Sequence, residues 1–172
     1  MRTSGNSINV TEENVDTTRR NTQAISRKSL LPDSLTKITG DFNGDGKRDS
    51  AVVIPPYQDE NGLCEQCITK IAFTNSIESI TIPYESNGAI LFNAGDLDGN
   101  KSDELLLIPD WFNSCLGLQF IYSYKAGKWD TIASGQVYRC APRNTIRKIR
   151  NGLFTMSENI EGAVSVKTIQ IK

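Results

Sequence analysis

A short acidic segment ahead of an apolar run constrains this chain more than any other feature of its sequence. Residues 40–49 read GDFNGDGKRD, and the apolar run 51–54 follows almost at once. Counted from Asp41, oxygen-bearing side chains stand at positions one, three, five and nine, and glycines stand at positions four and six. Alternate residues of such a tight loop turn their side chains inward. The segment therefore predicts a loop that closes around a common point and leads into a buried strand.

Calcium ions need this arrangement, because they take six to eight oxygen ligands at roughly 2.3–2.6 Å. Gly46 lets the backbone bend sharply at position six. Carboxylates held so close together would repel one another strongly without a cation between them. We therefore assign a calcium site to the side chains of Asp41, Asn43, Asp45 and Asp49 and to the backbone carbonyl of Lys47. The alternative is a surface turn without metal, since Asp, Asn and Gly favour turns.

The run 40–53, GDFNGDGKRDSAVV, resembles the FG-GAP/VCBS-type repeat, the calcium-loop repeat of integrin alpha-chain propellers and of many bacterial secreted proteins. The loop also begins like an EF-hand, but position twelve is Val52 instead of Glu, and the flanks 35–38 and 51–54 read as strands. The resemblance implies a propeller-like arrangement of sheets, calcium as the cofactor, and a bacterial-type secreted or lipid-anchored protein.

The same pattern occurs again further along the chain. Residues 36–41 align with 91–96 at an offset of 55, and residues 49–55 align with 103–109 at an offset of 54. The change of offset predicts that the second copy lost one residue inside its loop. A third, weaker copy begins at Thr145, where Asn151 and Gly152 replace the loop by a hairpin turn. The copies cover about 34–84, 89–140 and 145–172.

The second loop keeps Asp96, Asp98 and Asn100 at positions one, three and five, but Lys101 replaces the glycine at position six. The closing carboxylate is Asp103 or Glu104, and we assign Asp103 to a second, weaker calcium site. Either the shortened loop closes around calcium with Asp103, or Lys101 neutralises the carboxylates and the loop is a plain turn.

Short β-rich runs separated by turn residues predict an all-β domain over residues 31–172. Each copy reads as three or four antiparallel strands, one blade of a propeller. The apolar runs 52–54 and 105–108 predict second strands covered on both faces by neighbouring blades. About three blades cannot close a normal propeller. We therefore expect an open or partial propeller, a sandwich-like variant, or half of an assembly that a second copy completes as a homodimer. The polar residues 1–30 read as a flexible tether.

Cysteine and histidine usage bears on the cellular compartment and on catalysis. The chain has no His, which excludes Cys/His zinc sites and His-based triads, and it has four cysteines: Cys64, Cys67, Cys115 and Cys140. A hairpin that pairs Tyr124 with Trp129 brings the last two close together, so we predict a disulfide between them. Cys64 and Cys67 either form a second, small bridge or act as a CxxC redox pair. Disulfides and calcium together predict an extracytoplasmic location: periplasmic, cell-surface or secreted.

Loops at matched positions of the two copies carry aromatic residues: Tyr57 in the first copy, Trp111 and Phe112 in the second. They either form a ligand face or cap the core beside them. The basic residues between 139 and 150 lack interleaved aromatics, and the net charge is −1, so we expect no nucleic-acid partner. Contact with a membrane would require an N-terminal anchor that has been removed.

These observations predict a non-catalytic, calcium-stabilised, extracytoplasmic domain for protein recognition, adhesion or inhibition of a partner. A first alternative is a carbohydrate-binding accessory domain of a surface glycan system that uses Tyr57, Trp111 and Phe112. A second alternative is a thiol oxidoreductase that uses Cys64 and Cys67.

Overall fold

The computed structural model describes residues 33–111, 114–160 and 162–171. The predicted tether at residues 1–30 and the predicted ligand-face residue Phe112 lie outside these ranges. Within them the chain forms one four-residue helix, α1 (Asp33–Thr36), and eleven strands, so the prediction of an all-β fold is confirmed. No helix in this part of the chain has both the length and the apolar character to cross a membrane.

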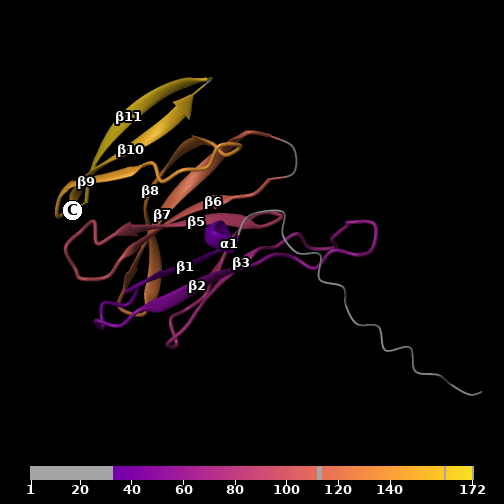
Figure 1. The fold of residues 1–172 in the computed structure, drawn as a ribbon, viewed down its shortest axis with the longest axis horizontal. Coiled ribbons are helices and arrows are strands. Elements are labelled where there is room, and N and C mark those ends of the chain that lie inside the picture. The colour runs from indigo at the N-terminus through magenta and orange to yellow at the C-terminus, as the bar shows by residue number, and fades with distance from the viewer. Residues whose placement is uncertain (1–32, 112–113, 161, 172) are drawn as a thin grey trace, which may run out of the picture.

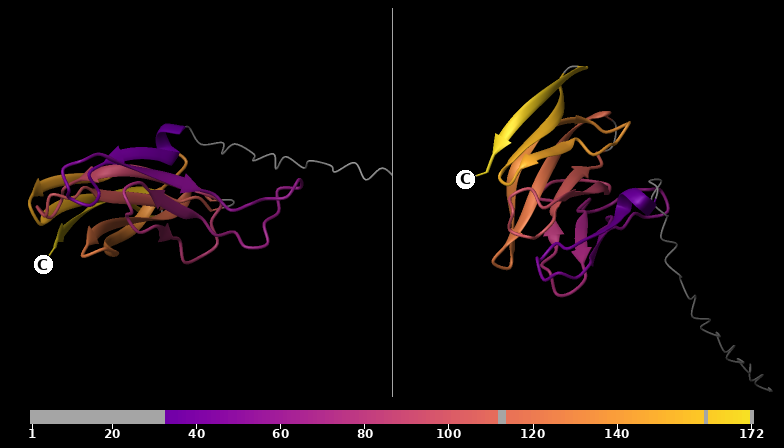
Figure 2. Two further views of the ribbon diagram at one scale, coloured as in Figure 1. Left: turned by 90° about the horizontal axis from the view of Figure 1, so that it is seen from below. Right: turned by 60° about the vertical axis from the view of Figure 1, so that its left-hand side comes forward.

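The strands form three antiparallel sheets, each built in chain order (Figures 1 and 2). The first sheet contains β1 (Lys37–Gly40), β2 (Asp49–Ile54), β3 (Lys70–Phe73) and β4 (Ile80–Thr81). The second contains β5 (Ala89–Gly95), β6 (Glu104–Pro109), β7 (Leu116–Lys125) and β8 (Lys128–Tyr138). The third contains β9 (Ile146–Arg150), β10 (Leu153–Ile160) and β11 (Ala163–Gln170). Each sheet has the meander topology of one propeller blade.

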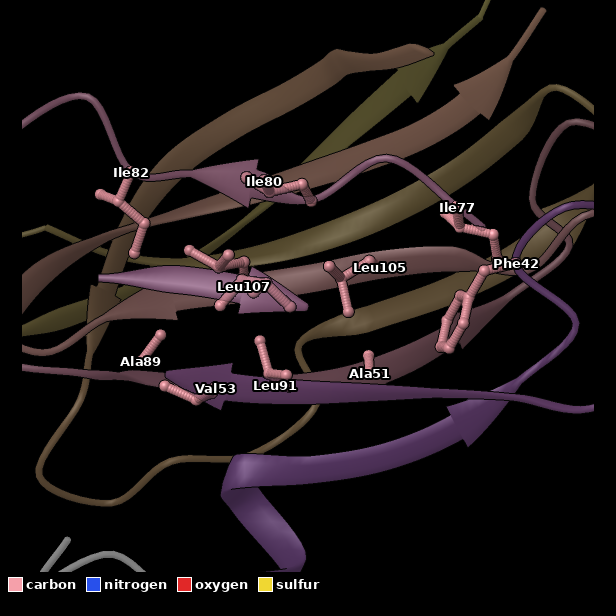
Figure 3. Packing of buried hydrophobic residues seen from close by; sticks show 11 residues of the cluster. Phe42, Ala51, Val53, Ile77, Ile80, Ile82, Ala89, Leu91, Leu105 and Leu107 are labelled. Carbon is pink, nitrogen blue, oxygen red and sulfur yellow. The ribbon is translucent and has the colours of Figure 1, made fainter. Parts of the chain in front are cut away.

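The main core lies between the first and second sheets (Figure 3). Ala51 and Val53 of β2 point into it and meet Leu91 of β5 and two leucines of β6. Phe42, from the loop after β1, closes one end of this layer and is fully buried. The alternation along β2 places Val52 and Ile54 on the opposite face.

The second strands of the two copies differ in burial. All six residues of β6 are buried, because Leu105 and Leu107 face the first sheet while Leu106 packs with Phe154 and Met156 of the third. The prediction of a strand covered on both faces is therefore right for β6. It is wrong for β2, where Val52 is 36% and Ile54 50% exposed. The first sheet ends the stack, so its outer face has no neighbouring sheet among the described residues.

The difference in length between the two copies lies in the strands and not in the loop. Gly40 pairs with Asp49 across the first loop, and Gly95 pairs with Glu104 across the second, so the two loops have equal length. The register shifts between Asn93 and Gly95, where β5 carries an irregularity of the β-bulge kind. The expectation of a shortened second loop is therefore wrong, and the offset stays at 55 from Gly40 to Asp49.

Both predicted disulfides are present. Cys115 and Cys140 join the start of β7 to the segment after β8, with Cα atoms 5.0 Å apart, and the hairpin pairs Tyr124 with Trp129 as predicted. Cys64 and Cys67, with Cα atoms 5.4 Å apart, bridge within the connection between β2 and β3. Two disulfides in one small domain are typical of an oxidising environment.

Candidate metal centre

The two acidic segments, called here the first loop (residues 41–49) and the second loop (residues 96–104), fold in the same way. In the first loop, Asp41 Oδ1 accepts the N–H groups of Gly44 at 2.8 Å and Asp45 at 3.1 Å, and its Oδ2 accepts the N–H of Gly46 at 2.8 Å. These hydrogen bonds curl the backbone around the carboxylate of the first residue. In calcium loops such a curl turns the side chains of alternate residues inward.

The second loop repeats these contacts around Asp96. Its Oδ1 accepts the N–H of Gly99 at 2.6 Å, and its Oδ2 accepts that of Lys101 at 3.3 Å. Lys101 has a φ of 77°, close to the 81° of Gly46. A side chain in this region costs on the order of 1 kcal/mol. Lys101 nevertheless adopts the backbone conformation of a glycine, and the second loop keeps its shape.

The closing residues of the two loops are Asp49 and Glu104. Phe42 N donates to Asp49 Oδ2 at 2.9 Å, and Leu97 N donates in the same way to Glu104 Oε2. Glu104 lies eight residues after Asp96, as Asp49 lies eight after Asp41. This equal spacing is the sequence signal that identifies Glu104, and the assignment of a shortened loop concealed it.

Three carboxylates converge in the second loop. Oxygens of Asp96, Asp98 and Glu104 all lie within 4.8 Å of one another, the one such group of three among the described residues. Glu104 is fully buried, and its Oε1 has no hydrogen-bond partner of regular geometry in the described structure. Ser123 Oγ is likewise buried, and its hydroxyl lies close enough to Glu104 to lower the pKa of the acid, although no hydrogen bond of regular geometry joins the two. The second loop, the weaker of the two in sequence, thus contains the tighter cluster of acids.

The electrostatics of the second loop reflect this crowding. Burial raises the pKa of Glu104 to about 7, the charges of Asp98 and Asp96 add to the rise, and the Leu97 N–H and Ser123 hydroxyl oppose it. Lys125 Nζ of β7 lies 2.7 Å from Asp98 Oδ2, and this contact raises the pKa of the lysine. Among the ion pairs of the described residues, the cation beside this loop is therefore Lys125 and not Lys101.

The acidic side chains of the first loop have different surroundings from those of the second, although the backbones match. Asp49 is 1% exposed, and both of its oxygens are occupied, one by Phe42 N and the other by Asn75 Nδ2 at 2.6 Å. Asp45 Oδ1 accepts the N–H of Lys47 at 2.8 Å and Asn43 Oδ1 accepts that of Asp45 at 3.0 Å. Asp49 holds the two ends of the loop together, while the side chains nearer the tip remain accessible.

Asp103, predicted to close the second loop, instead joins the two loops. Its N–H donates to Asp41 O at 2.6 Å, and its Oδ2 accepts the N–H of Asp41 at 3.0 Å and Asn93 Nδ2 at 2.7 Å. These bonds connect the first and second sheets at the acidic residue that begins the first loop. Asn93 was not among the residues that the sequence indicated.

The third sheet holds the second loop in a related way. Gly152 N, in the β9–β10 turn, donates to Leu97 O at 2.8 Å, and Lys148 Nζ donates to Asp96 O. The side chain of Asn151 lies directly against Gly99. Each acidic loop is therefore clamped by the sheet that follows it in the chain.

The three aromatic residues of the predicted ligand face have different surroundings. Tyr57 is 79% exposed. Trp111 packs edge-on against Tyr84, with ring centroids 5.6 Å apart, as expected of a residue that caps the core. Phe112 lies outside the described residues.

Fold and site together define a class: an all-β protein of three antiparallel, blade-like sheets in chain order, with two acidic loops at the junctions between sheets. Comparison of the chain with protein-family models, with curated proteins and with solved structures gives no match.

Proposed function

We propose that this protein is a non-catalytic, calcium-stabilised, extracytoplasmic domain that recognises another protein. The observation that carries the calcium assignment is the convergence of three carboxylates, those of Asp96, Asp98 and Glu104, the last of them fully buried. A buried acid with two acidic neighbours is costly unless a cation compensates it, and among the ion pairs of the described residues Lys125 reaches only Asp98 of the three. Carboxylate oxygens are the ligands that calcium prefers.

We assign a set of calcium donors to each acidic loop. The second loop would hold the ion with Asp96, Asp98, Asn100 and Glu104. The first loop would hold it with Asp41, Asn43, Asp45 and the carbonyl of Lys47, while Asp49 braces the ends of the loop. Bound calcium supplies positive charge to the carboxylates, and in this proposal it stiffens the junctions between sheets.

The recognition role follows from what surrounds these sites. Glu104 is the acid whose pKa is raised to about 7, and it belongs to a metal loop, where a bound cation would keep it ionised. The chain has no His to serve as a general base. The two disulfides support an oxidising compartment, and extracellular modules of this kind bind calcium with dissociation constants of about 10⁻⁴–10⁻³ M. A rigid β scaffold with exposed connections suits recognition, adhesion or inhibition of a partner protein.

The calcium assignment is tested by thermal melting of the purified protein, once with calcium and once with excess chelator. A calcium concentration of about 5 mM is several times the dissociation constant of typical extracellular sites. We expect calcium to raise the Tm by about 5 °C or more. Glu104→Gln should reduce the rise, and Glu78→Gln, the same change at an exposed glutamate outside both loops, should leave it in place. Equal melting curves in calcium and chelator would refute the assignment.

A further inference from the structure

The connection between β2 and β3 is the longest excursion from the sheets in the described structure. It covers residues 55–69, whereas the matching connection between β6 and β7 covers only 110–115. It extends well beyond the sheets, at the right of Figure 1. Connections of this length in compact domains are usually functional.

The connection is held in shape by its own hydrogen bonds and by a disulfide. Asp59 Oδ1 accepts the N–H groups of Asn61 at 2.9 Å and Leu63 at 2.8 Å, and Asp59 N donates back to Leu63 O at 2.8 Å. The Cys64–Cys67 bridge follows, and Ser86 N fixes Cys67 O to the scaffold at 2.6 Å. A loop organised in this way loses little conformational entropy when it binds a ligand.

Two large apolar side chains of this connection face solvent. Tyr57 is 79% and Leu63 69% exposed. Both line an open groove with a volume of about 790 Å³, together with Asp59, Cys64, Glu65 and Gln66. We call it the β2–β3 groove. Its volume lies within the range of roughly 300–1,000 Å³ that is common for ligand sites.

The groove is also strongly acidic. Asp59 and Glu65 line it, and the sequence from 51 to 69 contains no Lys or Arg. The hydrogen bond from the Leu63 N–H, with those from Asn61 and Gly62, lowers the pKa of Asp59, so this carboxylate stays charged well below neutral pH. The whole chain has a net charge of only −1, so the negative charge here is a local excess.

We propose that the β2–β3 groove binds a basic segment of a partner polypeptide. A Lys or Arg side chain of the partner lies over the ring of Tyr57, with its charge toward Asp59 and Glu65, and an apolar neighbour rests on Leu63. Cations are attracted to the faces of aromatic rings, and carboxylates around the ring strengthen the attraction. This inference rests on the proposed recognition function for the kind of partner, but it uses no residue of the calcium loops.

The test is selection of a random heptapeptide library on the immobilised full chain, followed by binding measurements with one selected peptide by fluorescence anisotropy. We expect the selected peptides to be enriched in Lys and Arg. Tyr57→Ala should weaken binding about tenfold and Glu65→Gln about threefold, because a few central contacts dominate an interface. Glu78→Gln, the same change at an exposed glutamate outside the groove, should have no effect. Far-UV circular dichroism verifies that each variant is folded.

Selection without Lys or Arg enrichment, or binding that Tyr57→Ala and Glu65→Gln leave unchanged, would overturn the inference. Binding of neutral oligosaccharides that depends on Tyr57, with no peptide bound, would overturn it in favour of a glycan. If the protein binds the peptide but calcium does not change its Tm, the calcium assignment is refuted and the inference about the groove stands. Calcium-dependent melting without peptide binding would refute the groove alone.

Discussion

Glu104 combines full burial with a position beside two other carboxylates. In the metal-free protein its pKa of about 7 leaves it roughly half protonated at neutral pH. An ion that binds there must displace this proton, so calcium affinity at the second loop should rise as the pH increases toward 7 and above.

Glu104→Gln separates the charge of this side chain from its shape. The amide oxygen can still accept the N–H of Leu97, but the buried charge is gone. We expect the free energy of unfolding in chelator at pH 8 to rise by about 1 kcal/mol, measured by urea denaturation, because burial of an uncompensated carboxylate is costly. The calcium response of the second loop should be lost in the same variant. If Glu104→Gln is less stable than the native protein in chelator and still binds calcium in the second loop, Glu104 is not a buried calcium ligand.

The pH dependence of stability gives a second residue-scale prediction. The folded-state pKa of Glu104 lies above its ordinary value of 4.5, so the folded state binds a proton more tightly than the unfolded state. The contribution of this group is therefore lost as the pH rises from about 4.5 to about 7, and it stays constant above that range. We expect metal-free protein to lose about 2 kcal/mol from this group over the range, after a discount for solvent screening.

The measurement is urea denaturation in chelator at a series of pH values, with Glu104→Gln as the reference. The difference between the native protein and the variant isolates this one group. Calcium should remove the pH dependence of this difference, because the bound ion keeps the carboxylate charged, and it should leave the native protein the more stable of the two. A difference that does not change with pH would show that Glu104 has an ordinary pKa.

Among the structural elements, the two acidic loops can be compared through two glycines of positive φ, one in each loop. Gly46 has a φ of 81° and nothing within 4 Å of an added Cβ, whereas Gly99 has a φ of 87° and an added Cβ would lie 2.2 Å from Asn151 Nδ2. Alanine at either position should cost about 1 kcal/mol for the backbone conformation. Gly99→Ala should cost a further 1 kcal/mol, roughly, because the side chain of Asn151 must move aside. Urea denaturation of the two variants measures the difference, and equal losses would contradict the contact.

The Cys115–Cys140 disulfide gives another prediction at this scale. Replacement of both cysteines by alanine should lower the free energy of unfolding by about 3 kcal/mol, since the bridge closes a loop with a sequence separation of 25. Chemical denaturation of oxidised protein and variant measures this loss. Cys64→Ser with Cys67→Ser opens a loop remote from the main core, so its larger effect should be on binding in the β2–β3 groove.

Over the whole molecule, the sequence predicted the three sheets well because each copy has its own alternating pattern and turns. It could not show that Val52 and Ile54 face outward, because β2 and β6 have similar apolar runs and only the position in the stack distinguishes them. The position of Glu104 was also concealed, because the apolar runs after the two loops align best at an offset of 54, whereas the loops themselves match at 55. The contacts of Asp103 and Lys125 join residues of different loops and strands, which local sequence patterns do not reveal.

Isothermal titration of calcium into chelator-treated protein tests the central claim most directly, which is that the acidic loops at the junctions of the sheets are calcium sites. We predict two bound ions per chain, one lost in Asp41→Ala and the other in Glu104→Gln. Folded protein that takes up no calcium at a concentration of a few millimolar, about ten times the typical dissociation constant of extracellular sites, would contradict the claim.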